Sequence, residues 1–215
     1  MPSTLHSADR AAALTRRSGP FARSLPWLLL VGGVIGLAAA FVLTVEKFAL
    51  ALDPAYAPTC SINPVLNCGS VMDTPQASAF GFPNSLLGIA GFAVVAAVGA
   101  ALLAGAVFAQ WFWSALQVGV TAAAGFVHWL IVQSLYDIGA LCPYCMAVWA
   151  VTVPIFWYVT LRNLDRARSK PALRQGFRLW LDSVIRNHSI PLTVWFLVLI
   201  ALIAQRFWSY WSTLL

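Results

Sequence analysis

Long apolar runs separated by short polar segments dominate the chain. Five runs, at about residues 25–50, 84–108, 111–136, 143–161 and 190–208, contain few charged side chains. A helix needs about 20 mostly apolar residues to cross the roughly 30 Å hydrocarbon core of a bilayer. The pattern therefore predicts an all-α integral membrane protein, with a four-helix bundle as its core and an additional fifth transmembrane helix.

The polar segments between these runs divide the chain into parts. We expect a cytoplasmic N-terminal tail at 1–24, a four-helix core at 25–161 and, within it, a long loop at 51–82. A basic linker at 162–189 and the fifth helix with a short outer tail at 190–215 follow. The first segment is polar and rich in arginine, without the short apolar stretch and small-residue cleavage site of a signal peptide.

Charge predicts the orientation of these segments. Only 9% of residues are charged, against about a quarter in soluble domains. The lysines and arginines gather in 1–24 and 162–189, and such residues mark cytoplasmic segments. We therefore expect a multi-pass protein of the inner or plasma membrane, with a cytoplasmic N-terminus and with 51–82 and 137–142 outside. The basic linker suits anionic lipid headgroups better than nucleic acid.

All four cysteines fall in the two segments expected outside. Cys60 and Cys68 are spaced C-x7-C in the loop, and Cys142 and Cys145 form a CPYC motif where the fourth helix begins. Pro143 suits the first helical position, and a helix N-terminus favours a reactive thiolate. Disulfides form and persist outside the cytoplasm. The pattern favours a redox relay, with Cys142 facing water-borne thiols and Cys145 deeper toward the lipid.

Other classes of protein compete with this reading. A structural membrane protein would hold the four cysteines in static disulfides, and four cysteines allow three pairings. A zinc site through four thiolates usually uses two CxxC-like motifs, which the C-x7-C spacing does not provide, so we expect no metal. A transporter or channel needs polar groups in mid-membrane, which these apolar runs scarcely contain.

Several motifs together resemble the vitamin K epoxide reductase family, in particular its bacterial members, over residues 25–161. They are the C-x7-C loop, Thr74 six residues later, FGFPNSLLG at the start of the second helix and CPYC opening the fourth. The resemblance implies a membrane thiol:quinone oxidoreductase that supports disulfide formation in exported proteins. It makes Cys142 and Cys145 the active-site pair beside a quinone, menaquinone or ubiquinone, which Cys145 reduces. It makes Cys60 and Cys68 the shuttle pair, with Cys68 forming a transient disulfide to Cys142.

The resemblance also implies roles for polar and aromatic residues. Asn84 matches a residue that hydrogen-bonds a quinone oxygen, although its place after Pro83 also fits helix capping. Thr74 matches a hydroxyl residue near the docking surface of the loop. Trp149 stands where animal relatives have an aromatic hydroxyl. His128, within the third span, is a candidate for a quinone or proton role, or for a hydrogen bond to a neighbouring helix.

The thiol donor is expected to be a separate protein. Some bacterial relatives carry a thioredoxin-like domain after a fifth helix, whereas here only SYWSTLL follows that helix. We therefore expect the partner to be a separate thioredoxin-fold disulfide oxidase, DsbA-like, on the outer side of the membrane.

Overall fold

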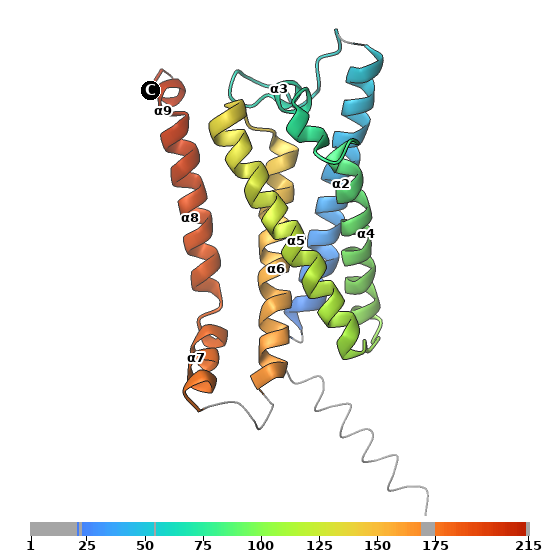
Figure 1. Cartoon of the computed structure of the whole chain (residues 1–215), viewed down its shortest axis with the longest axis vertical. Coiled ribbons are helices and arrows are strands. Elements are labelled where there is room, and N and C mark those ends of the chain that lie inside the picture. Colours follow the sequence, from blue (N-terminus) through green and yellow to red (C-terminus); the bar gives the residue numbers. More distant parts are fainter. Residues whose placement is uncertain (1–20, 22, 54, 169–174, 214–215) are drawn as a thin grey trace, which may run out of the picture.

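The computed structural model describes residues 21, 23–53, 55–168 and 175–213, so nearly all of the expected N-terminal tail lies outside the described residues. Within these ranges, five helical segments are long and apolar enough to cross a membrane (Figure 1). They are α2 (Ser24–Leu52), α4 (Asn84–Leu103), α5 (Gln110–Val132) with its π-helical continuation η2 (Gln133–Ile138), α6 (Pro143–Arg168) and α8 (Ser189–Arg206). No described residue belongs to a β-strand, and the predicted all-α membrane fold is confirmed.

Shorter helices occupy the two ends of the bundle. At one end lie α3 (Cys68–Met72), the 3-10 helix η1 (Pro75–Ser78) and α9 (Trp208–Trp211); at the other lies α7 (Gln175–Arg186) (Figure 1). The helix α6 runs on to Arg168, past the predicted end at residue 161. Hydropathy reports where a chain leaves apolar surroundings, whereas helical hydrogen bonding can continue into water.

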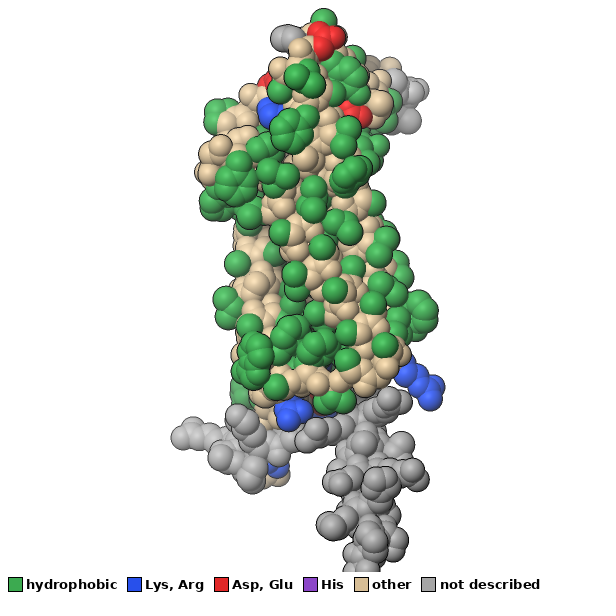
Figure 2. Space-filling view, turned by 90° about the vertical axis from the view of Figure 1, so that its right-hand side faces the viewer, with side chains coloured by type: hydrophobic (Ala, Val, Ile, Leu, Met, Phe, Trp, Pro, Cys, Tyr) green, Lys and Arg blue, Asp and Glu red, His purple; other side chains and the backbone are tan. Residues whose placement is uncertain are grey.

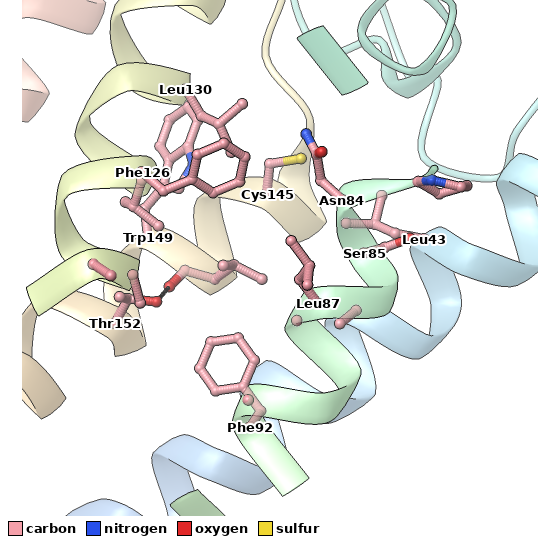
Figure 3. Close-up of a pocket in the computed structure, with 18 of the residues that line it drawn as sticks. Leu43, Asn84, Ser85, Leu87, Phe92, Phe126, Leu130, Cys145, Trp149 and Thr152 are labelled. Atoms are coloured by element: carbon pink, nitrogen blue, oxygen red, sulfur yellow. Dashed lines mark hydrogen bonds between the residues drawn. The ribbon is translucent and has the colours of Figure 1, made fainter. Parts of the chain in front are cut away.

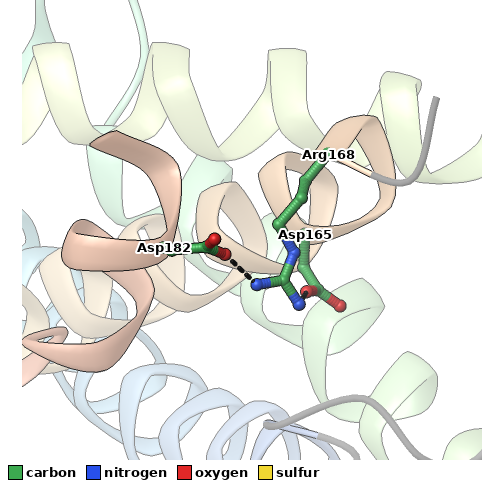
Figure 4. Close-up of polar contacts among 3 residues, drawn as sticks. All are labelled: Asp165, Arg168 and Asp182. Carbon is green, nitrogen blue, oxygen red and sulfur yellow. Dashed lines mark hydrogen bonds and ion pairs between the residues drawn. The ribbon is translucent and has the colours of Figure 1, made fainter. Parts of the chain in front are cut away.

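An ion pair from Arg168, the last residue of α6, connects this helix to α7. Arg168 forms an ion pair with Asp165 at 2.8 Å, one turn earlier on the same helix, and a second with Asp182 of α7 (Figure 4). Pairs three residues apart support a helix by a few tenths of a kcal/mol. The segment expected to be a plain linker thus contains a helix that is held against the bundle.

Small residues bring α2 and α4 into close contact. A Cβ added to Gly33 would lie 2.6 Å from the backbone nitrogen of Ala96, and one added to Gly99 would meet the backbone of Leu29 and Leu30. Membrane helices associate closely where small side chains let their backbones approach. The helix α2 also packs on α6, and α6 packs on α5.

A polar network ties α5 to α6 near the basic end of the bundle. Gln117 Nε2 donates to Thr160 Oγ1 at 2.9 Å, and Asn163 Nδ2 donates to Gln117 Oε1 at 3.0 Å. The Arg162 guanidinium lies 3.6 Å from the centre of the Trp113 ring. These groups satisfy one another's hydrogen-bonding capacity and link the two helices.

Apolar side chains cover the outer surface of the bundle. Figure 2 shows the face that carries α2 and α4, where green side chains extend along the length and charged side chains appear near the ends. Val31, Val34 and Phe48 of α2 are at least half exposed. Such a band fits contact with lipid.

Candidate active site

The CPYC motif sits where α6 begins. Cys142 immediately precedes Pro143, and its carbonyl accepts the backbone N–H of Met146 at 2.9 Å. The pKa of the Cys142 thiol is lowered, first by the hydrogen bond from the Cys145 thiol and then by the backbone N–H groups of Cys145 and Tyr144, which together outweigh its burial. The geometry favours a thiolate at Cys142.

Backbone hydrogen bonds join the cysteine loop to the turn before α6. The Leu141 N–H donates to the carbonyl of Val65 at 2.8 Å, and the Leu141 carbonyl accepts the N–H of Asn67 at 2.9 Å. The side chain of Asn67 then accepts the N–H of Ser70 and caps α3. Because α3 begins at Cys68, this pairing brings Cys68 directly over Cys142.

Three of the four sulfurs form one buried cluster. Cys60 and Cys68 are joined in a disulfide, whereas Cys142 and Cys145 are free thiols. The Cys142 Sγ lies 3.0 Å from the Cys68 Sγ, a separation typical of atoms poised to react. The sulfurs of Cys60, Cys68 and Cys142 all lie within 4.8 Å of one another. A four-thiolate zinc site would need Cys60 and Cys68 as separate thiolates, but here they are bonded to each other.

An apolar cavity of about 720 Å³, lined by residues of α2, α4, α5 and α6 and open on one side, lies beneath this cluster. Its walls are mainly aliphatic and aromatic, including Leu87, Phe92, Phe126 and Leu130 (Figure 3). Cys145 lines the cavity, and Figure 3 shows its sulfur directed toward Asn84 on α4. The two cysteines of the motif thus face different surroundings: Cys142 contacts the loop disulfide, and Cys145 contacts the cavity.

Asn84 begins α4 but does not cap its own helix. Its side-chain carbonyl accepts the N–H of Ala79 at 3.1 Å, and its amide donates to the carbonyl of Gln76 at 2.6 Å. The side chain therefore fixes the segment around η1 over the mouth of the cavity. An amide nitrogen carries two hydrogens, so one remains for a ligand.

Two other predicted residues also line the cavity. Trp149 is buried, with 2% of its surface exposed, and forms part of the wall beside Cys145. Thr74 lies at the outer margin, where its hydroxyl donates to the carbonyl of Val71 at 2.8 Å. Both therefore line the same cavity as Cys145.

His128 lies outside the cavity wall. Its Nδ1 is 2.7 Å from the carbonyl of Ala124, and its Nε2 accepts the indole N–H of Trp195 at 2.9 Å. An indole N–H can only donate, so Nε2 is the acceptor in the contact with Trp195. The structure thus places His128 in a hydrogen bond between α5 and α8, the alternative that the sequence left open.

Polar residues outside the predicted set of site residues hold the cysteine loop in place. The Gln76 amide donates to Asp137 at 2.6 Å and to Gln133 at 3.3 Å, linking η1 to η2. On the other side, Lys47 donates to the carbonyl of Met72, and the buried carboxylate of Glu46 accepts the Thr59 hydroxyl. For Glu46 and Lys47, the sequence offers one signal of such a role, namely that charged residues stand at the end of an apolar run.

Comparison with known proteins agrees with this geometry. The model of the vitamin K epoxide reductase family matches residues 27–160. The chain belongs to this family. The match runs from within α2 to within α6 and includes all four cysteines and the residues that line the cavity, whereas α7, α8 and α9 lie beyond it. Membership makes the protein a membrane thiol oxidoreductase. No curated protein matches the chain significantly.

Proposed function

We propose that the protein is a thiol:quinone oxidoreductase that reoxidises a separate thioredoxin-fold disulfide oxidase and passes the electrons to a membrane quinone. One observation carries the proposal. Cys142 Sγ lies 3.0 Å from Cys68 Sγ, while Cys145 of the same motif lines an apolar cavity. The two pairs can therefore exchange with each other, and one of them faces a space that suits a lipid-soluble acceptor.

The electrons pass between the pairs by thiol–disulfide exchange. The partner's dithiol first reduces the Cys60–Cys68 disulfide and becomes oxidised itself. The Cys68 thiolate then attacks Cys142 of a Cys142–Cys145 disulfide, and Cys145 leaves as a thiolate. Attack of Cys60 on Cys68 closes the loop disulfide again and releases Cys142. A Cys60–Cys68 disulfide beside free thiols at Cys142 and Cys145 is the arrangement expected after this step, which supports the proposal.

The cavity fits a quinone in size and lining. Its volume of about 720 Å³ lies within the range of roughly 300–1,000 Å³ that is typical of ligand sites. When bound, a quinone supplies an acceptor for two electrons and two protons. Asn84 would offer one amide hydrogen and Trp149 a flat wall, and the Cys142–Cys145 dithiol would supply the two electrons and two protons. Oxidation of Cys145 by this route re-forms its disulfide with Cys142.

The distribution of charge supports an orientation for this chemistry. Seven lysines and arginines lie in 162–189, the linker that follows the catalytic core at 25–161. We place this linker and the tail at 1–24 in the cytoplasm, because cytoplasmic segments are rich in these residues. The sulfur cluster then lies on the outer side, where exported proteins acquire disulfides.

Reduction of a quinone by purified protein in lipid nanodiscs, with a dithiol donor, tests the proposal. In Cys145→Ser the rate should fall to that without protein, because no thiol then faces the cavity. Ser212→Ala, exposed near the C-terminus, serves as the matched control and should keep the parental rate. An undiminished rate in Cys145→Ser would reject the proposal.

A structural membrane protein with static disulfides is the alternative to a relay, and the redox state of the Cys60–Cys68 bond distinguishes the two. Static disulfides would resist mild dithiols and would not support turnover. A relay should instead reduce and re-form the Cys60–Cys68 bond in every cycle. Quantifying that bond by peptide mass spectrometry, with and without quinone, distinguishes the two.

A further inference from the structure

The fifth helix contacts the rest of the molecule in an uneven way. None of the described residues of α8 is buried, and most of its length stands beside the bundle (Figure 1). At its outer end, however, Arg206 Nε donates to the carbonyl of Leu135 at 2.7 Å. The next residue, Phe207, is 6% exposed. The helix α8 thus meets α5 and its continuation at two points, through Trp195 at His128 and through Arg206 at Leu135, and the second point lies close in sequence to the turn before Cys142.

The carbonyl that Arg206 binds belongs to η2, the π-helical continuation of α5. The helix widens there into the π-helical turn η2, closed by a hydrogen bond from Gly139 N–H to Ser134 carbonyl at 3.0 Å. Carbonyls in the last turn of a helix lack intrahelical donors, and π-helical turns often mark functional sites. Arg206 supplies a charged donor at this point, which is stronger than a neutral one.

Only three residues separate the end of η2 from Cys142. It turns at Gly139, with φ of 68°, a conformation that glycine adopts readily. Leu141 then pairs with the loop residue Leu66, and Cys142 follows. A shift of η2 would therefore move Cys142 relative to Cys68.

Aromatic residues after Arg206 extend this support. Phe207 belongs to one apolar cluster with Val65 of the loop and Leu141 of the turn, and Tyr210 and Trp211 pack against the same cluster. The residues that follow α8 thus pack against both the cysteine loop and the turn before α6. The pairing of these two segments sets the separation between Cys68 and Cys142.

We propose that α8, through Arg206, positions the turn before the CPYC motif so that Cys142 meets Cys68. Arg206 is a positioning residue, since it contacts neither sulfur nor the cavity. The role rests on the proposed relay. It assigns a function to a helix outside the region matched by the family model.

The test uses the full chain carrying Cys145→Ser. Here Cys142 attacks Cys68, a Cys68–Cys142 bond forms and Cys60 is released as a thiol, with no other reactant consumed. Peptide mass spectrometry after alkylation gives the ratio of the Cys68–Cys142 bond to the Cys60–Cys68 bond. Adding Arg206→Ala should lower this ratio about tenfold, the size expected for losing a charged hydrogen bond. Arg206→Lys should recover most of it, and Arg186→Ala, exposed on α7, should leave it unchanged.

A second readout separates positioning from general loss of structure. With Cys145 intact, Arg206→Ala should lower kcat for quinone reduction while leaving KM for the quinone unchanged, because the cavity is untouched. If Arg206→Ala fails to fold, Arg206→Gln carries the same comparison. An unchanged ratio in Arg206→Ala, or no recovery in Arg206→Lys, overturns the positioning role alone. Absence of any Cys68–Cys142 bond in the Cys145→Ser parent overturns the relay and the positioning role with it.

Discussion

Cys142 shows how far a motif determines the chemistry of one residue. Its place before Pro143 at a helix start predicts a stabilised thiolate from sequence alone. The structure adds that the Cys145 thiol is the largest cause of the lowered pKa. It also adds the contact with Cys68, which no spacing along the chain could reveal because 74 positions separate the two cysteines.

The cause of this lowered pKa leads to a prediction about pH. In a protein carrying Cys60→Ala and Cys68→Ala, adding Cys145→Ser or Cys145→Ala leaves Cys142 as the single thiol. The serine hydroxyl can still donate to the Cys142 sulfur, whereas alanine cannot. With serine, alkylation by iodoacetamide should persist to a pH below the ordinary thiol pKa of about 8.5. With alanine, the midpoint should move upward, as followed by intact mass across pH. Equal midpoints would contradict this assignment of the cause.

At the scale of helices, the glycines separate into two groups that the sequence does not distinguish. Gly33 and Gly91 both belong to small-residue patterns typical of close helix contact. Gly33 is indeed pressed against the backbone of α4, but a Cβ on Gly91 would meet nothing within 4 Å. Gly91 lines the cavity. Which face of α4 meets another helix depends on packing across the bundle, and local spacing does not encode it.

The open space beside Gly91 predicts that a small and a large substitution at this position have opposite effects. Gly91→Ala has room and should stabilise α4 by about 0.5–1 kcal/mol, because glycine loses more backbone entropy in a helix. Gly91→Phe should fill the cavity and abolish quinone reduction, while the exchange between Cys68 and Cys142 continues. Gly125→Phe is the matched control, since Gly125 also has open space but does not line the cavity. Thermal unfolding and quinone turnover in nanodiscs provide the measurements. Equal loss of turnover in both phenylalanine variants would argue against a quinone in this cavity.

At the scale of the whole molecule, the apolar runs along the chain predict the number and order of the membrane spans well. Five apolar runs give five membrane-length helices, because burial in hydrocarbon acts on each segment separately. The lateral order does not follow from such signals: α2 packs between α4 and α6, and a cavity lies among the four core helices. That order arises from contacts such as Gly99 against Leu29 and Leu30. His128 illustrates the same limit, because its partner Trp195 lies on a helix 67 positions away.

The orientation of the molecule in its membrane provides the last prediction. In a cysteine-free variant, Ser70→Cys beside the loop and Ser212→Cys near the C-terminus should react with a membrane-impermeant maleimide in intact cells. Ser183→Cys on α7 should react only after permeabilisation. All three serines are exposed, so access to the reagent depends on the side of the membrane and not on burial. The reverse pattern would place the sulfur cluster in the reducing cytoplasm, where disulfides rarely persist. A relay that delivers oxidising equivalents to exported proteins could not operate from that side.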